Sequence, residues 1–144
     1  MSDTVAAAPT SDSPEAVEEA IRTLVRRFYG KARQDALLGP VFNTHVTDWE
    51  HHFARIDDFW SHVLLGTKRY SGHPYPLHVQ LPIKLEHFPR WVALFEETAN
   101  ETLAPHLAEQ VIAKAHMMAA SFQAGIFPFK DANGRPSRVA PPRG

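Results

Sequence analysis

Apolar residues recur at steps of three and four residues along four long stretches of this chain. That spacing is typical of amphipathic helices, in which one stripe of apolar side chains faces a core. The stretches cover about residues 14–32, 47–66, 89–104 and 105–125, and no stretch shows the clear alternation of a strand. With 44% of its 144 residues apolar, the chain has enough core material for one domain. The sequence therefore predicts an all-α domain.

Residues with strong positional preferences mark the ends of these helices. Ser13 precedes the first helix, and Thr47 and Glu50 have the spacing of a capping box at the start of the second. Gly66 suits the end of the second helix. Between the first two helices, residues 35–46 predict a turn and a brief helical corner. Proline is expected in the first turn of the other helices, at Pro14, Pro89 and Pro105.

An irregular connector separates the second and third helices. Prolines and Gly72 prevent a long regular helix in residues 67–88, yet this stretch contains His73, His78 and His87. From the residues alone, His78 is better explained as a loop side chain bonded to a backbone carbonyl than as a metal ligand. Spacing within the connector does not separate the three histidines.

The two ends of the chain differ from the helical part. The first residues are rich in Ala, Ser, Thr, Asp and Pro, and the last ones contain Pro, Gly and Arg without apolar periodicity. Such segments gain too little burial to offset the entropy of ordering them. We therefore expect a flexible leader at 1–13, a helical domain at 14–129 and a flexible tail at 130–144.

Composition excludes several classes of protein. Fifteen basic against sixteen acidic residues leave a net charge of −1, which gives no electrostatic attraction for nucleic acid or an anionic membrane. The absence of cysteine excludes disulfides, thiolate ligands and covalent attachment of a haem. There is neither a secretory signal nor an apolar run of membrane-spanning length. We expect a cytoplasmic protein with neither a nucleic-acid nor a membrane partner.

Nine histidines and three tryptophans are the unusual part of the composition. Helical spacing places Tyr29, His52 and Trp91 on the inner faces of three helices, and His78 lies in the connector. Buried side chains of these types need hydrogen-bond partners. Around an iron, such hydroxyl, imidazole and indole groups can stabilise a gas ligand that gains negative charge. Each of these side chains also has an ordinary explanation as part of a core.

Several longer stretches resemble the group III truncated haemoglobins, a family of small bacterial globins. The resemblance covers about residues 21–127. It is carried by Phe28-Tyr29, Leu38 to Asn43, Trp49 to His52, Phe59-Trp60, Leu64 to Gly66, Tyr70 to Pro74, His78 to Pro82, His87 to Trp91, and Leu94 to Glu97.

The resemblance implies a truncated globin fold, in which a two-over-two helical sandwich surrounds one non-covalent haem b. It implies that His78 is the proximal iron ligand. It also implies that Tyr29, His52 and Trp91 line the distal side, where dioxygen, nitric oxide or carbon monoxide binds. His73 and His87 are the rival proximal residues in the same connector. The sequence leaves open whether His52 donates to the ligand, gates the pocket or binds iron.

Further residues are expected around the haem. Lys68, Arg69 and Tyr70 precede the histidines of the connector, where they could pair with propionates, although a basic pair at a helix end equally well complements the dipole. Apolar side chains are expected to pack on the macrocycle. They are Phe42, Ile56, Phe59, Leu77, Leu81, Phe88 and Phe95.

Three kinds of function remain open at this point. A gas-binding haem protein explains the resemblance, and the same pocket could also serve a nitric oxide dioxygenase or a peroxidase-like enzyme. Such turnover needs an external reductase, because the chain has no flavin-binding segment. A non-haem metal protein could use His51, His52 and His73 around zinc, although the H-E-x-x-H motif is absent. In a plain helical interaction module, every histidine would be structural.

Overall fold

The computed structural model describes residues 13–70 and 83–140. These residues form four long helices, with a short helix, α2 (Gly39–His45), between the first two. The long helices are α1 (Pro14–Ala32), α3 (Trp49–Leu65), α5 (His87–Thr102) and α6 (Pro105–Ile126). The predicted all-α class is confirmed.

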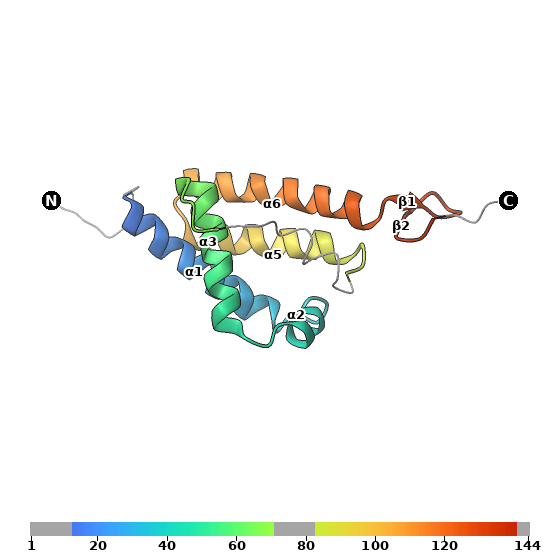
Figure 1. Ribbon diagram of the computed structural model, residues 1–144, viewed down its shortest axis with the longest axis horizontal. Helices are drawn as coiled ribbons and strands as arrows, with labels where there is room; N and C mark the ends of the chain where they lie inside the picture. The colour runs from blue at the N-terminus through green and yellow to red at the C-terminus, as the bar shows by residue number, and fades with distance from the viewer. Residues whose placement is uncertain (1–12, 71–82, 141–144) are drawn as a thin grey trace.

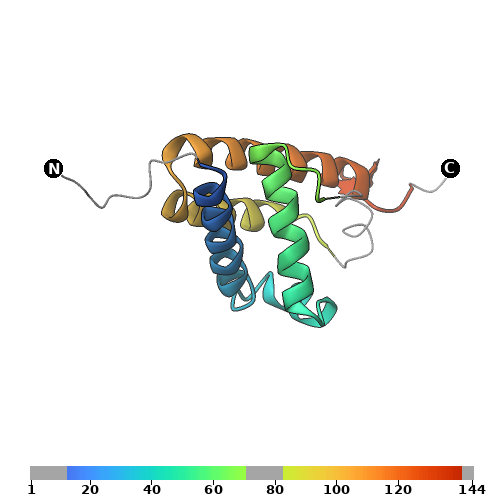
Figure 2. The same ribbon diagram turned by 60° about the vertical axis from the view of Figure 1, so that its left-hand side comes forward.

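The four long helices form two crossed pairs. α5 and α6 run side by side, and α1 and α3 lie across them (Figure 1, Figure 2). α1 packs on both α3 and α5, and α3 also packs on α6. This is the two-over-two arrangement that the resemblance implies. The interior is therefore enclosed by side chains from all four helices.

α1 begins and buries its stripe as its sequence predicts. The Ser13 Oγ atom accepts a hydrogen bond from the Ala16 amide at 3.2 Å, and Pro14 follows as the first helical residue. Both residues satisfy the needs of a helix start, because the hydroxyl binds an exposed amide and proline has none. The predicted inner face is buried, namely Ile21, Leu24, Val25, Phe28, Tyr29 and Ala32.

The start of α3 differs from the prediction. Asp48 rather than Thr47 caps this helix, because its Oδ1 atom accepts a hydrogen bond from the His51 amide at 3.1 Å. Aspartate caps helices at least as well as threonine, and the first helical residue is Trp49. The predicted end is confirmed, since Gly66 has a φ of 70°, a left-handed conformation that favours glycine.

α5 begins two residues before the predicted proline. His87 is its first residue, so Pro89 lies inside the first turn. Proline is tolerated there because the first amides of a helix have no partner within the helix. The start of α6 at Pro105 is confirmed.

Residues 129–140 contain a pair of strands that the sequence did not predict. β1 (Phe129–Lys130) and β2 (Pro136–Ser137) pair antiparallel. In the turn between them, the Asp131 Oδ1 atom accepts hydrogen bonds from the amides of Asn133 and Arg135 at 2.8 and 3.0 Å. Local polar bonds form this turn, so apolar periodicity gave no indication of it. The limits of the leader, domain and tail stay predictions.

Asp35 joins the turn after α1 to the start of α5. Its carboxylate accepts hydrogen bonds from the amides of Leu37 and Leu38 at 3.0 and 2.9 Å and from the Arg90 guanidinium at 2.7 Å. The hydrogen bond from Arg90 and those from the amides lower the pKa of Asp35 below its usual value. Because the Asp35 side chain is only 8% exposed, this contact is better shielded from water than an ordinary surface ion pair.

We expect Asp35→Asn to lower the free energy of unfolding by about 1 kcal/mol at neutral pH, because the ion pair with the solvent-exposed Arg90 is lost. Since the folded-state pKa of Asp35 is lowered, its contribution is complete above an unfolded-state pKa of about 3.9. It is lost as the pH falls through the folded-state value. Urea unfolding of both proteins between about pH 7 and about pH 2 measures this difference.

Glu109→Gln changes an exposed carboxylate on α6 and serves as the control for Asp35→Asn. The control should unfold like the parent protein. A difference for Asp35→Asn that stays the same at every pH would contradict the role given to its ionised carboxylate.

Candidate functional site

Two adjoining apolar cavities lie among the helices. The α3-side cavity has a volume of about 60 Å³ and is lined by side chains that include Tyr29, Phe42, Phe59, Tyr70, Trp91 and Phe95. The α6-side cavity has a volume of about 70 Å³ and is lined by side chains that include Leu38, Phe42, His87, Phe88, Trp91 and Phe122. Phe42, Trp91 and Met118 line both.

Tyr29 from α1 presents a neutral hydroxyl at the α3-side cavity. Its side chain is 7% exposed, and burial raises its pKa well above the usual value for tyrosine. The hydroxyl therefore keeps its proton at neutral pH. Within the described residues, no group accepts a hydrogen bond from it. Tyr29 can thus donate to a ligand in the cavity.

A column of stacked rings fixes Trp91 of α5 at the boundary between the two cavities. Its ring stacks on Phe95 with centroids 5.4 Å apart, and Phe95 stacks on Trp60 of α3 at 5.1 Å. Phe28 of α1 contacts Trp91 edge-on at 6.0 Å and Tyr29 at 5.1 Å. Rings from three helices therefore hold Trp91 and Tyr29 in a fixed relation.

His52 lies beside Tyr29 rather than in the lining of the cavity. Its ring meets the Tyr29 ring edge-on at 5.0 Å and the Trp49 ring at 5.6 Å. The His52 Nε2 atom is buried, whereas His51 is exposed. The structure thus places His52, not its neighbour, on the inner face of α3. His52 does not line the α3-side cavity itself.

The other residues expected around a haem divide into described and undescribed ones. All five described apolar residues line a cavity, with Phe42 in both, Phe88 in the α6-side cavity, and the remaining three in the α3-side cavity. Those three are Ile56, Phe59 and Phe95. The remaining expected residues lie outside the described part of the chain, namely His73, Leu77, His78 and Leu81.

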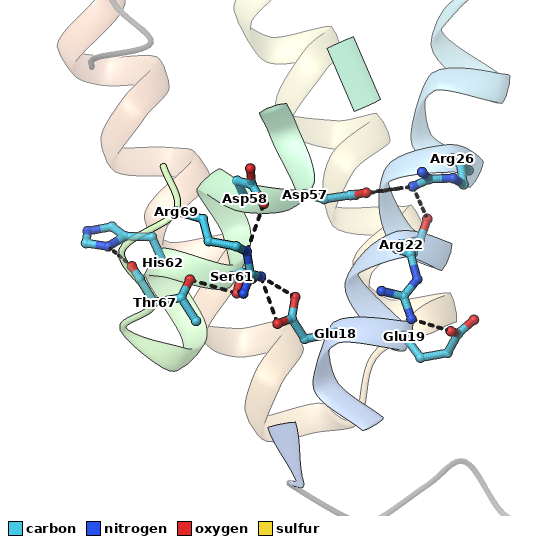
Figure 3. Close-up of polar contacts among 10 residues, drawn as sticks. All are labelled: Glu18, Glu19, Arg22, Arg26, Asp57, Asp58, Ser61, His62, Thr67 and Arg69. Atoms are coloured by element: carbon cyan, nitrogen blue, oxygen red, sulfur yellow. Dashed lines mark hydrogen bonds and ion pairs between the residues drawn. The ribbon is translucent and has the colours of Figure 1, made fainter. Parts of the chain in front are cut away.

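The three residues suggested for propionates lie in different surroundings. Tyr70 lines the α3-side cavity. Arg69 instead donates to the Glu18 carboxylate at 2.7 Å and to Asp58 at 3.1 Å, which ties the end of α3 to α1 (Figure 3). Lys68 is exposed. In this arrangement the guanidinium of Arg69 is occupied by protein carboxylates.

His87 lies in the α6-side cavity, where its ring is held by the backbone. The Lys84 amide donates to its Nδ1 atom at 2.7 Å. An amide can only donate, so Nδ1 is an acceptor and the neutral ring carries its proton on Nε2. An imidazole in this state has no free lone pair for iron, which argues against His87 as the rival proximal ligand.

Two residues of α6 contribute to the cavities although the sequence assigned them only to a helix stripe. Met118 lines both cavities, and Phe122 lines the α6-side cavity. Their spacing matched that of ordinary core residues, so nothing in the sequence pattern distinguished a pocket role.

Within the described residues, no group of three or more His, Cys, Asp or Glu side chains is arranged to hold a metal ion directly. The zinc alternative relied on His51, which is exposed, and on His73, which lies outside these residues. Among the same residues, no helix is both long and apolar enough to cross a membrane.

Comparison with known proteins agrees with this arrangement. The family model described as bacterial-like globin matches residues 16–124. This chain belongs to that globin family. It is 35% identical over 117 residues to the group 3 truncated hemoglobin ctb of Campylobacter jejuni subsp. jejuni, covering 78% of this chain and 92% of the relative. The crystal structure of the group III truncated hemoglobin from Campylobacter jejuni superposes with a TM-score of 0.71 at 36% identity, covering 76% of this chain and 91% of that one.

The resemblance to group III truncated haemoglobins is therefore confirmed, and the chain is a haem-binding globin. Its described residues fit such a group. The cavities are lined almost entirely by apolar and aromatic side chains, which suit a flat macrocycle. The polar groups at the α3-side cavity, including Tyr29 and Trp91, are neutral donors rather than carboxylates. Because the globin has no cysteine, a thioether attachment is excluded.

We expect Phe95→Ala to lower the free energy of unfolding of this globin by about 3–5 kcal/mol, the usual cost of removing a buried aromatic ring. Phe95 is 3% exposed and lies between the rings of Trp60 and Trp91. Urea unfolding measures the loss, and near-ultraviolet circular dichroism reports the environment of the two tryptophans. Phe129→Ala, at a 39% exposed position, is the control and should change stability by less than about 1 kcal/mol. Equal losses of stability in the two variants would contradict the role given to the stacked rings.

Proposed function

We propose that this globin holds a haem b without covalent attachment, bonds the iron through His78, and reversibly binds dioxygen or another diatomic ligand. The observation that carries the proposal is the neutral hydroxyl of Tyr29 at an apolar cavity, close to Trp91. A donor that is kept protonated and shielded from water interacts strongly with a small polar ligand. The relative from Campylobacter jejuni is itself named a haemoglobin, which supports the same function.

His78 lies outside the described residues, so its role is supported by indirect observations. The family match covers residues 16–124, which contain all three histidines of the connector. The rival His87 has its Nδ1 atom engaged as an acceptor of the Lys84 amide. In a proximal histidine the roles of the two nitrogens are normally the opposite. Its Nδ1–H group donates to a carbonyl, and its Nε2 atom binds iron. These observations favour His78 over His87.

When bound, the haem supplies an iron centre to which one end of a diatomic ligand bonds. The Tyr29 hydroxyl and the Trp91 indole donate hydrogen bonds to that ligand, while apolar side chains such as Phe59 exclude water. His52 contacts the ring of Tyr29, so we assign it a supporting role that orients Tyr29 or controls entry. Reversible binding consumes no electrons, whereas redox turnover at this site requires an external reductase.

We expect His78→Gly to abolish the Soret band of the haem-reconstituted protein or shift it strongly, because the iron loses its protein ligand. Imidazole added to the solution should restore a spectrum close to that of the parent protein, because it can occupy the vacated position. Absorption spectroscopy measures both effects. His73→Gly is the matched control in the same connector and should keep the parent spectrum. The assignment to His78 fails if the two variants exchange these behaviours.

Tyr29→Phe should raise the dissociation rate of dioxygen by roughly 2- to 12-fold, the factor that corresponds to one hydrogen bond of ~0.5–1.5 kcal/mol. Stopped-flow measurement of dioxygen release from the ferrous protein tests this. Carbon monoxide is the control ligand, because it accepts hydrogen bonds more weakly and should change much less. An unchanged dioxygen rate would remove Tyr29 from the ligand-binding role.

A further inference from the structure

His87 lies where the connector enters α5 and has a feature that the proposed function does not use. It is the first residue of α5, is 8% exposed and lines the α6-side cavity. Apart from Trp91, the other described residues around this cavity have apolar side chains. Burying an imidazole among such residues costs free energy unless its two nitrogens find partners.

The ring of His87 has a defined protonation pattern. Its Nδ1 atom accepts the Lys84 amide hydrogen at 2.7 Å, so the proton of the neutral ring is on Nε2. Among the residues that the structure describes, none accepts a hydrogen bond from this Nε2–H group. His87 therefore offers one donor at the edge of the α6-side cavity.

The surroundings of this donor leave it available for a carboxylate acceptor. The first turn of α5 contains no acidic side chain, and Glu86, which precedes it, makes no side-chain capping bond. Lys84 and Glu86 are both exposed and of opposite charge, so neither sign of charge dominates beside the ring. An apolar cavity with one such donor fits an apolar ligand that carries a carboxylate.

We propose that the Nε2–H group of His87 donates a hydrogen bond to one of the two haem carboxylates. This inference rests on the proposed haem binding and adds a contact at the α6-side cavity. It gives a haem carboxylate a partner other than Arg69, whose guanidinium is bonded to Glu18 and Asp58. His87 would then hold the cofactor by its edge, whereas His78 holds it by the iron.

Two substitutions of His87 separate its two nitrogens. His87→Asn keeps an acceptor near the position of Nδ1 and removes Nε2–H. His87→Gln keeps an N–H donor near the position of Nε2 and removes the acceptor for the Lys84 amide. A purely structural histidine would be replaced better by asparagine, whereas a carboxylate donor would be replaced better by glutamine.

The first measurement is the rate at which the reconstituted protein loses haem to an excess of a haem-scavenging apoglobin. We expect His87→Asn to raise this rate by about tenfold, the effect of losing one hydrogen bond to a charged group. His87→Gln should stay within about threefold of the parent rate. Urea unfolding of the haem-free proteins should rank the variants in the opposite order, because only glutamine loses the acceptor for the Lys84 amide.

The second measurement repeats the haem-loss assay with the dimethyl ester of haem, in which both carboxylates are neutral. The tenfold effect of His87→Asn should then shrink to less than about threefold. The inference is overturned if His87→Asn loses haem at the parent rate, or if its effect is the same with the ester. Failure of the parent protein to bind haem with one-to-one stoichiometry would instead overturn the proposed function, so the two failures are distinguishable.

Discussion

The contact of the Phe28 ring with the rings around it is the interaction on which both the helix packing and the site depend. Phe28 is 3% exposed and meets Tyr29, Trp91 and Phe95 edge-on. It belongs to α1, the helix that packs on both α3 and α5. Because protein interiors are close-packed, a shift of α1 at this point would displace the Tyr29 hydroxyl and the Trp91 indole together. The packing of rings around Phe28 therefore fixes both the crossing of the helices and the positions of the two donors.

Polar contacts at the periphery fix how the helices and the connector are joined. Arg69 links the end of α3 to Glu18 of α1, and Arg26 of α1 binds Asp57 of α3 at 3.1 Å (Figure 3). Exposed ion pairs of this kind contribute only about 0–1 kcal/mol each, so their main effect is on the relative position of the helices. The Asp35–Arg90 pair is different, because the Asp35 side chain is only 8% exposed. Its partner Arg90 directly precedes Trp91 in the sequence.

The two cavities offer different hydrogen-bond donors to a ligand. At the α3-side cavity, a neutral phenol and an indole surrounded by aromatic rings suit a small ligand with partial negative charge. At the α6-side cavity, the N–H group of a single imidazole among apolar side chains suits a carboxylate. Since Phe42, Trp91 and Met118 line both cavities, one extended apolar ligand can lie against both sets of donors.

The sequence by itself determined the helices and their inner faces, because periodicity, caps and prolines act within a few residues. Ser13, Gly66 and the stripe of α1 followed from such local rules, and motif resemblance supplied the family. The same local rules did not identify the cap of α3. Asp48 and Thr47 are both good N-cap residues, and only the position at which the helix begins selects Asp48. Tertiary structure alone decided that Trp91 stacks in a column, that His52 lies beside Tyr29, and that His87 directs its acceptor to Lys84. The physical reason is that these contacts join residues on different elements or depend on the orientation of a ring, and neither is encoded in the spacing of apolar residues.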